Sequence, residues 1–159
     1  MTESIQNCIT FLCVTAVLQI TALQDVRDMD NVTWWLFLPL PIVRVVFLIV
    51  NPGMSCYWSP VLDSVAGSVL GVLALVLSLV GLCGGADIVM IACVGFTVGF
   101  VDAVHSLLYA STIMLIVQIV VSLRNRSLKG LSRKSVPYIP YFTAGFVLAF
   151  VINHFMEVY

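Results

Sequence analysis

Charged residues are scarce in this sequence. Lys, Arg, Asp and Glu make up 9% of its 159 residues and 61% are hydrophobic, whereas soluble domains carry roughly 25% charged residues. The mean hydropathy is +1.11. So little polar surface excludes a soluble domain, and the apolar runs are too long and too frequent for a soluble core. The net charge of −1 excludes a broad nucleic-acid footprint.

Several functional signatures are also missing. None of the five cysteines forms a CxxC pair, and four of them lie in apolar runs. They therefore indicate small buried side chains rather than a zinc site or a disulfide framework. The N-terminus has neither the basic region nor the small-residue cleavage site of a secretory signal, so we expect its first apolar run to be a retained helix.

Long apolar runs are abundant. A hydrocarbon core about 30 Å thick needs about 20 helical residues. The interruptions between the runs predict six transmembrane helices, at about 5–23, 34–50, 61–82, 88–101, 104–123 and 137–155. We therefore predict an all-α, polytopic membrane protein with one transmembrane domain over residues 1–159. The fourth helix is the shortest.

The basic residues assign the loops to the two sides of the membrane. Five of the seven Lys and Arg residues fall between the fifth and sixth helices, at Arg124, Arg126, Lys129, Arg133 and Lys134. The positive-inside rule places this loop in the cytoplasm, where it offers a contact for acidic lipid headgroups. Counting back along the chain places both termini outside. The loops that hold Asp25 and Asp87 then share the cytoplasmic face.

Ionisable side chains inside apolar runs are costly and need a reason. We expect Arg44 to pair with Asp63 or Asp102 within the bundle, or to extend towards the interface. Asp102 and His105 fall at the face opposite to Asp25. They are open to a metal or proton site, but a surface or interhelical hydrogen bond is the favoured interpretation.

Two pairs of glycines have a small-xxx-small spacing. Gly67 and Gly71 form one pair in the third predicted helix, and Gly95 and Gly99 form another in the fourth. Such spacing lets helix backbones approach closely in lipid. It predicts close helix packing rather than chemistry.

Two aspartates are candidates for catalysis. Asp87 follows Gly84, Gly85 and Ala86 and precedes a wholly apolar run, where its structural role would be an N-cap. Asp25 closes the first helix, and alone it would be an interfacial acid paired with an arginine. Two carboxyls a few ångströms apart, however, can share one proton and activate a water molecule, as aspartic proteases require.

The run Gly84-Gly85-Ala86-Asp87 resembles the GxGD motif of membrane aspartic proteases, in the GGAD form of archaeal prepilin and preflagellin (archaellin) peptidases. The segment 23–34 resembles the surroundings of that family's first catalytic aspartate, with a basic residue and an aromatic entry to the next helix. The segment 136–145 is similar to the Pro-aromatic-x-Pro-aromatic opening of the family's last helix. The three matches occur in the family's order.

The resemblance implies an aspartic endopeptidase that removes the short class III leader peptide of pilin-like or archaellin-like precursors at the cytoplasmic boundary of the plasma membrane. It implies that Asp25 and Asp87 form the catalytic pair and that no metal or organic cofactor takes part. Gly84, Gly85 and Ala86 would let an extended substrate backbone approach. Two alternatives stay open, namely a presenilin-like protease that cuts within membrane spans, and a small transporter or non-catalytic scaffold.

Overall fold

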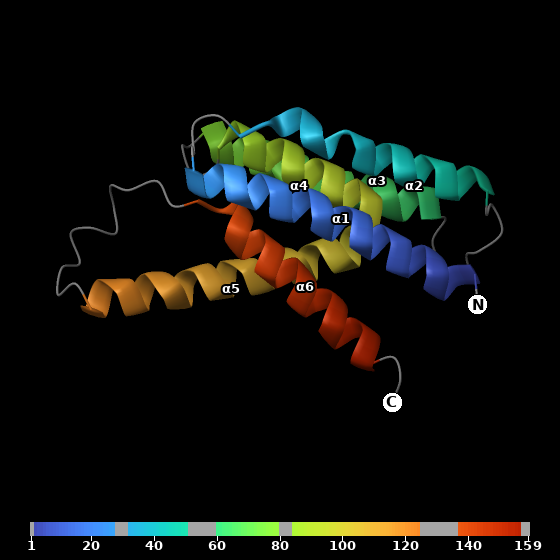
Figure 1. Ribbon diagram of the computed structural model, residues 1–159. Helices are drawn as coiled ribbons and strands as arrows, with labels where there is room; N and C mark the ends of the chain where they lie inside the picture. The colour runs from blue at the N-terminus through green and yellow to red at the C-terminus, as the bar shows by residue number, and fades with distance from the viewer. Residues whose placement is uncertain (1, 28–31, 51–59, 80–83, 125–136, 157–159) are drawn as a thin grey trace.

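A computed structural model of the chain describes residues 2–27, 32–50, 60–79, 84–124 and 137–156. Within these ranges every regular element is a helix, which confirms the all-α prediction for this part of the chain (Figure 1). The elements are α1 (Thr2–Arg27), the 3-10 helix η1 (Trp34–Phe37), α2 (Pro39–Val50), α3 (Pro60–Leu79), α4 (Gly85–Val98), α5 (Phe100–Arg124) and α6 (Ile139–Met156).

Several helix boundaries differ from the prediction by three to five residues. α1 begins at Thr2 instead of residue 5, α2 at Pro39 instead of residue 34, and α5 at Phe100 instead of residue 104. α1 continues to Arg27, beyond the predicted end at residue 23, because no Gly or Pro interrupts the chain there. α4 begins at Gly85 instead of residue 88, and it ends at Val98 instead of residue 101. The early end has a local cause, since Gly99 adopts φ +93° and breaks the helix before α5 begins at Phe100.

The corner between α4 and α5 is closed by a residue of another helix. Asp63, in the first turn of α3, accepts a hydrogen bond at Oδ1 from the backbone N–H of Phe100 (3.0 Å). This N–H belongs to the first turn of α5, where donors lack a partner within the helix. A Cβ atom on Gly99 would overlap the Asp63 carboxylate. The corner therefore requires glycine both for its backbone angle and for the space beside it.

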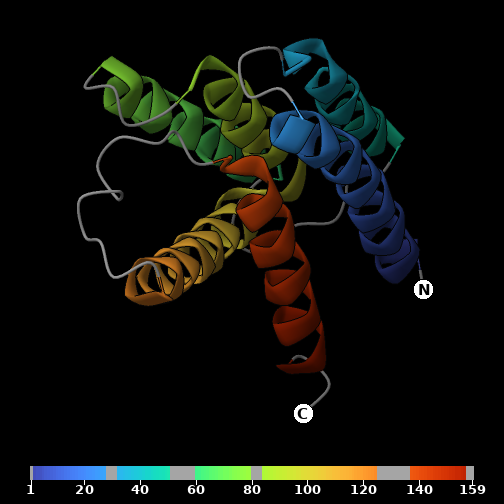
Figure 2. The same cartoon turned by 60° about the vertical axis from the view of Figure 1, so that its left-hand side comes forward.

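The helices pack most extensively in two pairs, α3 with α4 and α5 with α6. α1 to α4 run roughly side by side, whereas the C-terminal half of α5 extends away from them, as Figures 1 and 2 show. α1 lies against α6, and α5 joins the two pairs through its contacts with both α3 and α4. The ends of α1, α4 and α6 that carry Asp25, Asp87 and Ile139 thereby meet at one end of the molecule (Figure 1).

Glycines set the close approach within both pairs. A Cβ on Gly67 of α3 would overlap the carbonyl oxygen of Gly95 of α4, and the reverse also holds. One turn along α3, Gly71 faces Ala92 in the same way. In the other pair, Gly145 of α6 lies against the backbone of α5. The close packing predicted from the spacing of the first three of these glycines is confirmed.

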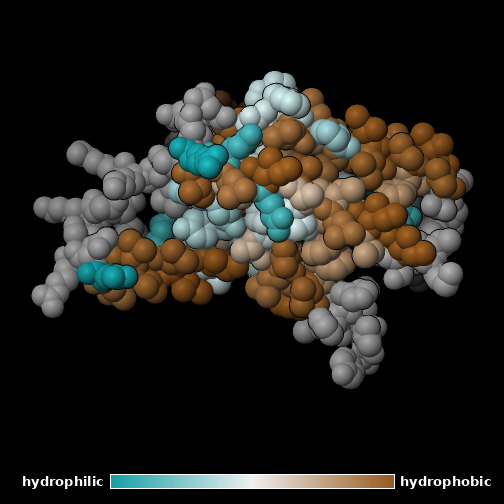
Figure 3. All heavy atoms as spheres, viewed as in Figure 1, coloured by the Kyte–Doolittle hydropathy of each residue, from teal (hydrophilic) through white to brown (hydrophobic). Residues whose placement is uncertain are grey.

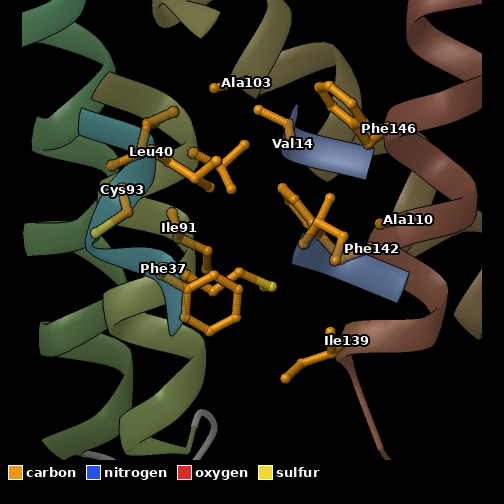
Figure 4. Close-up of a cluster of buried hydrophobic side chains, with 14 of the residues drawn as sticks. Val14, Phe37, Leu40, Ile91, Cys93, Ala103, Ala110, Ile139, Phe142 and Phe146 are labelled. Carbon is orange, nitrogen blue, oxygen red and sulfur yellow. The ribbon is translucent and has the colours of Figure 1, made fainter. Parts of the chain in front are cut away.

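The core lies between α1, η1, α4 and α6. Figure 4 shows Val14, Phe37, Ile91 and Phe142, one from each of these elements, pointing into a common interior. All four side chains are buried. This core fixes α4 relative to α1 and α6, and it therefore sets the relative positions of the two aspartates.

The exterior of the bundle is also apolar. Large hydrophobic side chains are exposed on every α-helix except α4, and hydrophobic residues dominate the face seen in Figure 3. Within the described ranges, three helices are long and apolar enough to cross a membrane, at Ile5–Arg27, Pro60–Leu79 and Phe100–Arg124. The apolar segments Trp34–Val50, Gly85–Val98 and Ile139–Asn153 are shorter.

Candidate active site

Asp25 belongs to the inward face of α1. The buried residues of this helix include Val14, Leu18, Thr21 and Asp25, at intervals of four, three and four residues. This spacing follows one face of an α-helix. The side chain is 6% exposed, and its Oδ2 accepts a hydrogen bond from the backbone N–H of Ile139 (3.1 Å). Asp25 is therefore a buried acid inside α1 and not an interfacial acid beyond its end.

Asp87 is the third residue of α4. Its Oδ2 accepts a hydrogen bond from the backbone N–H of Gly84 (3.0 Å), the residue that caps the helix. The interpretation of Asp87 as the N-cap itself was wrong by three positions, because the helix begins at Gly85. An acid at this position satisfies a free backbone donor and interacts favourably with the positive end of the helix dipole.

The two acids line the same cavity, which has a volume of about 650 Å³. They are close enough for the charge of Asp25 to act on Asp87. The three residues that precede Asp87 also line the cavity, as do apolar side chains of α4, α6 and the entry to η1: Gly84, Gly85, Ala86, Val32, Trp34, Val89 and Ile139. The structure therefore brings together every site residue that the sequence predicted.

Gly85 leaves open space beside Asp87. Gly84 and Gly85 are exposed, and a Cβ on Gly85 would meet no atom within 4 Å. The backbone of this short stretch is thus accessible from the cavity, next to Asp87. An extended peptide backbone has room to approach here.

Each acid keeps one oxygen available for chemistry. Asp25 and Asp87 use Oδ2 for the hydrogen bonds to Ile139 and Gly84, while their Oδ1 atoms accept none from the described residues. Two nearby carboxyls with unused oxygens can share a proton and orient a water molecule between them. Such a pair can act as general base towards water and as general acid towards a leaving amine.

Ile139 is the contact that the sequence did not reveal. Its backbone N–H is the first of α6, and no side-chain pattern marks a backbone donor. The sequence carries only an indirect signal for it, namely the resemblance of segment 136–145 to the opening of the family's last helix. Asp28, Asp30 and the basic residues beyond Arg124 lie outside the described residues.

Three of the other ionisable residues, Arg44, Asp102 and His105, line a separate cavity towards the opposite end of the bundle. Arg44 donates from Nε to Ser64 Oγ (3.0 Å), and the charge of Asp63 acts on it. The expected pairing with Asp63 is confirmed only as an effect of its charge, because the two side chains form no direct ion pair, and the hydrogen bond to Ser64 was not anticipated. Asp102 and His105 are both contacted by Asn153 of α6, so the prediction of an interhelical hydrogen bond is confirmed for Asp102.

No family model, curated protein or solved structure matches this chain. The resemblance to prepilin and preflagellin peptidases therefore rests on the three segments of sequence that carry it.

Proposed function

We propose that this chain is a membrane aspartic endopeptidase that cleaves the leader peptide of pilin-like or archaellin-like precursors. One observation carries the proposal, namely that Asp25 of α1 and Asp87 of α4 line a single cavity. The two acids come from helices far apart in sequence, and each has a carboxylate oxygen without a hydrogen bond from the described residues. This arrangement suits a proton-sharing pair.

The membrane part of the proposal is supported by the exterior of the bundle. Three helices are long and apolar enough to span, and exposed hydrophobic side chains cover the helices on their outer sides. In this proposal all six helices are embedded in the membrane. The basic loop after α5 faces the cytoplasm, and the dyad lies near that face.

In the proposed reaction one carboxyl is protonated and the other is ionised. The ionised group removes a proton from water, which attacks the scissile carbonyl, and the protonated group hydrogen-bonds to the carbonyl oxygen. When the intermediate collapses, the leaving amide nitrogen receives a proton from the dyad. Gly84 and Gly85 receive the extended substrate backbone beside Asp87. The residues in this scheme require no metal or organic cofactor.

The test is to incubate the purified protein, reconstituted in lipid, with a panel of class III leader peptides that each continue into an apolar segment. We expect one cut at the junction between the charged leader and the apolar segment. A cut inside the apolar segment would instead favour a presenilin-like protease. No product from any peptide, with both aspartates intact and the protein folded, would contradict the proposal.

A further inference from the structure

A second cavity lies at the other end of the bundle. Its volume is about 410 Å³, and residues of α1, α2, α4, α5 and α6 line it. Thr10 of α1 is one of them, fifteen residues before Asp25. At a rise of about 1.5 Å per residue, the two cavities are separated by about 22 Å along this helix. We call the second one the distal cavity.

A positive charge lines the distal cavity from α2. The guanidinium of Arg44 is anchored through Nε, which donates to Ser64 Oγ, and it lies near Asp63. A guanidinium carries five N–H donors in a planar fork that suits phosphate oxygens. Among the described residues, only the Nε donor of Arg44 is in a hydrogen bond, so its terminal nitrogens are available towards the cavity.

A negative charge lines the same cavity from α5. Asp102 Oδ1 accepts a hydrogen bond from Asn153 Nδ2 (2.9 Å), and the same nitrogen lies 3.3 Å from His105 Nδ1. All three residues line the cavity. The hydrogen bond from Asn153 of α6 fixes the Asp102 carboxylate at the edge of the cavity.

The third component of the distal cavity is an aromatic wall. Phe11 of α1 stacks on Phe150 of α6 with ring centroids 3.9 Å apart, and it lies 5.7 Å from the ring of Phe146. All three rings line the cavity. Aromatic rings offer an apolar surface for hydrocarbon and also attract ammonium groups.

We propose that the distal cavity binds a zwitterionic phospholipid headgroup of the phosphoethanolamine type. The phosphate binds at Arg44, the ammonium binds at Asp102, and the hydrocarbon adjoining the headgroup lies along the phenylalanines. A purely anionic ligand would face Asp102, and a purely cationic one would face Arg44. A ligand that carries both charges can pair its phosphate with Arg44 and its ammonium with Asp102.

The depth of the distal cavity agrees with this ligand. With Asp25 near one membrane boundary, a site about 22 Å away lies close to the other boundary of a hydrocarbon core about 30 Å thick. Headgroups are found at that level. The inference rests on the membrane location proposed above, but not on the protease activity.

The test uses the full-length protein in detergent micelles, titrated with phosphatidylethanolamine or with phosphatidylglycerol and followed by native mass spectrometry. We expect tighter binding of phosphatidylethanolamine. Each substitution removes one of the two charges that bind the headgroup, so Arg44→Gln and Asp102→Asn should each weaken that binding by about tenfold or more. Asp102→Asn keeps an acceptor for Asn153, so it tests the charge without removing the interhelical contact. Arg124→Gln, at the exposed end of α5, is the matched control and should have no effect.

Equal affinity for the two lipids, or unchanged binding in Asp102→Asn, would overturn the proposal. Soluble phosphoethanolamine is the second probe. If it competed with the lipid at equal concentration, the ligand would be a free solute and the lipid assignment would be wrong. Asp87→Asn should bind phosphatidylethanolamine normally, which separates this test from the test of the proposed protease.

Discussion

The carboxylate of Asp25 accepts a hydrogen bond from the backbone N–H of Ile139, the first residue of α6. The two residues lie 114 positions apart in the chain. The first turn of a helix has N–H groups without intrahelical partners, and a carboxylate there also interacts favourably with the helix dipole. Asp25 is consequently fixed by α6 as well as by α1. Its position relative to Asp87 depends on how α6 packs against the rest of the bundle.

Replacing either aspartate with asparagine should abolish peptide cleavage. An amide cannot share the proton, so Asp25→Asn or Asp87→Asn should lower the rate by at least about 100-fold. Asparagine still offers an oxygen to Ile139 or Gly84, so thermal unfolding should change little. Asp28→Asn is the control and should cost much less. If Asp28→Asn abolished cleavage while Asp25→Asn left it intact, the first acid would be misassigned.

Removing the donor at Ile139 should impair cleavage more than it impairs stability. Proline is tolerated at the first position of a helix but has no N–H, so Ile139→Pro deletes the hydrogen bond to Asp25. A hydrogen bond to a charged group contributes about 1.5–3 kcal/mol, and we expect cleavage to fall by about tenfold or more.

Ile139→Ala is the matched variant for that experiment. It loses comparable packing at this buried position but keeps the N–H. Thermal unfolding of both variants would measure the packing loss, and a peptide-cleavage assay would measure the effect of the donor. Equal rates in the two variants would show that the contact does not position Asp25.

The glycines should divide into two classes on substitution with alanine. Gly67→Ala forces a Cβ into the carbonyl oxygen of Gly95 and should destabilise the α3–α4 pair by about 1–3 kcal/mol, as overpacking does. Gly85→Ala meets nothing within 4 Å and should unfold like the original chain. Because its new methyl group would stand in the cavity, Gly85→Ala should nevertheless slow peptide cleavage. Unfolding in detergent and cleavage rates in lipid measure the two effects. Early unfolding of Gly85→Ala would contradict this division.

The corner at Gly99 should be sensitive to two different substitutions. Gly99→Ala places a side chain at φ +93° and against Asp63, which should cost about 1–3 kcal/mol. Asp63→Ala removes the acceptor for the Phe100 N–H and should cost about 0.5–2 kcal/mol, as the loss of a helix cap does. Asp63→Asn, which retains the acceptor, is the control. Equal unfolding temperatures for the alanine and asparagine variants would exclude a capping role.

Cysteine labelling should establish the sidedness of the chain. In a background without other cysteines, Leu128→Cys should react only with a reagent that reaches the cytoplasm, because it sits in the basic loop. Cys56 alone should react from outside. Both positions lie outside the described residues, so their accessibility is predicted from sequence alone. Labelling of residue 128 only from outside would place the dyad at the wrong face for leader cleavage.

Local sequence patterns predicted the helices because apolar runs and their interruptions are properties of adjacent residues. Some observed helix boundaries differ from the predicted ones because a single residue ends the helix. At Gly99 the backbone angle ends α4 earlier than hydropathy indicates. The extension of α1 to Arg27 likewise followed from the absence of a helix breaker. This extension makes Asp25 a buried helical residue.

The pairwise contacts were less accessible to prediction. The spacing of the glycines indicated close packing, but it did not indicate that Gly67 meets Gly95. The convergence of Asp25 and Asp87 followed from topology and the motif resemblance. The hydrogen bond to Ile139 did not, because it joins a side chain to a backbone group whose position depends on how α6 packs.

The length and the enclosure of α4 together have a consequence for how water reaches the two acids. Its 14 residues extend about 21 Å, against about 30 Å for the hydrocarbon core. None of its large hydrophobic side chains is exposed, because the other helices surround it. In a membrane, so short a helix cannot reach both boundaries, and an end of it would lie below the level of the headgroups. Water would then reach the end that carries Asp87 through the cavity between the helices instead of directly from the bulk solvent.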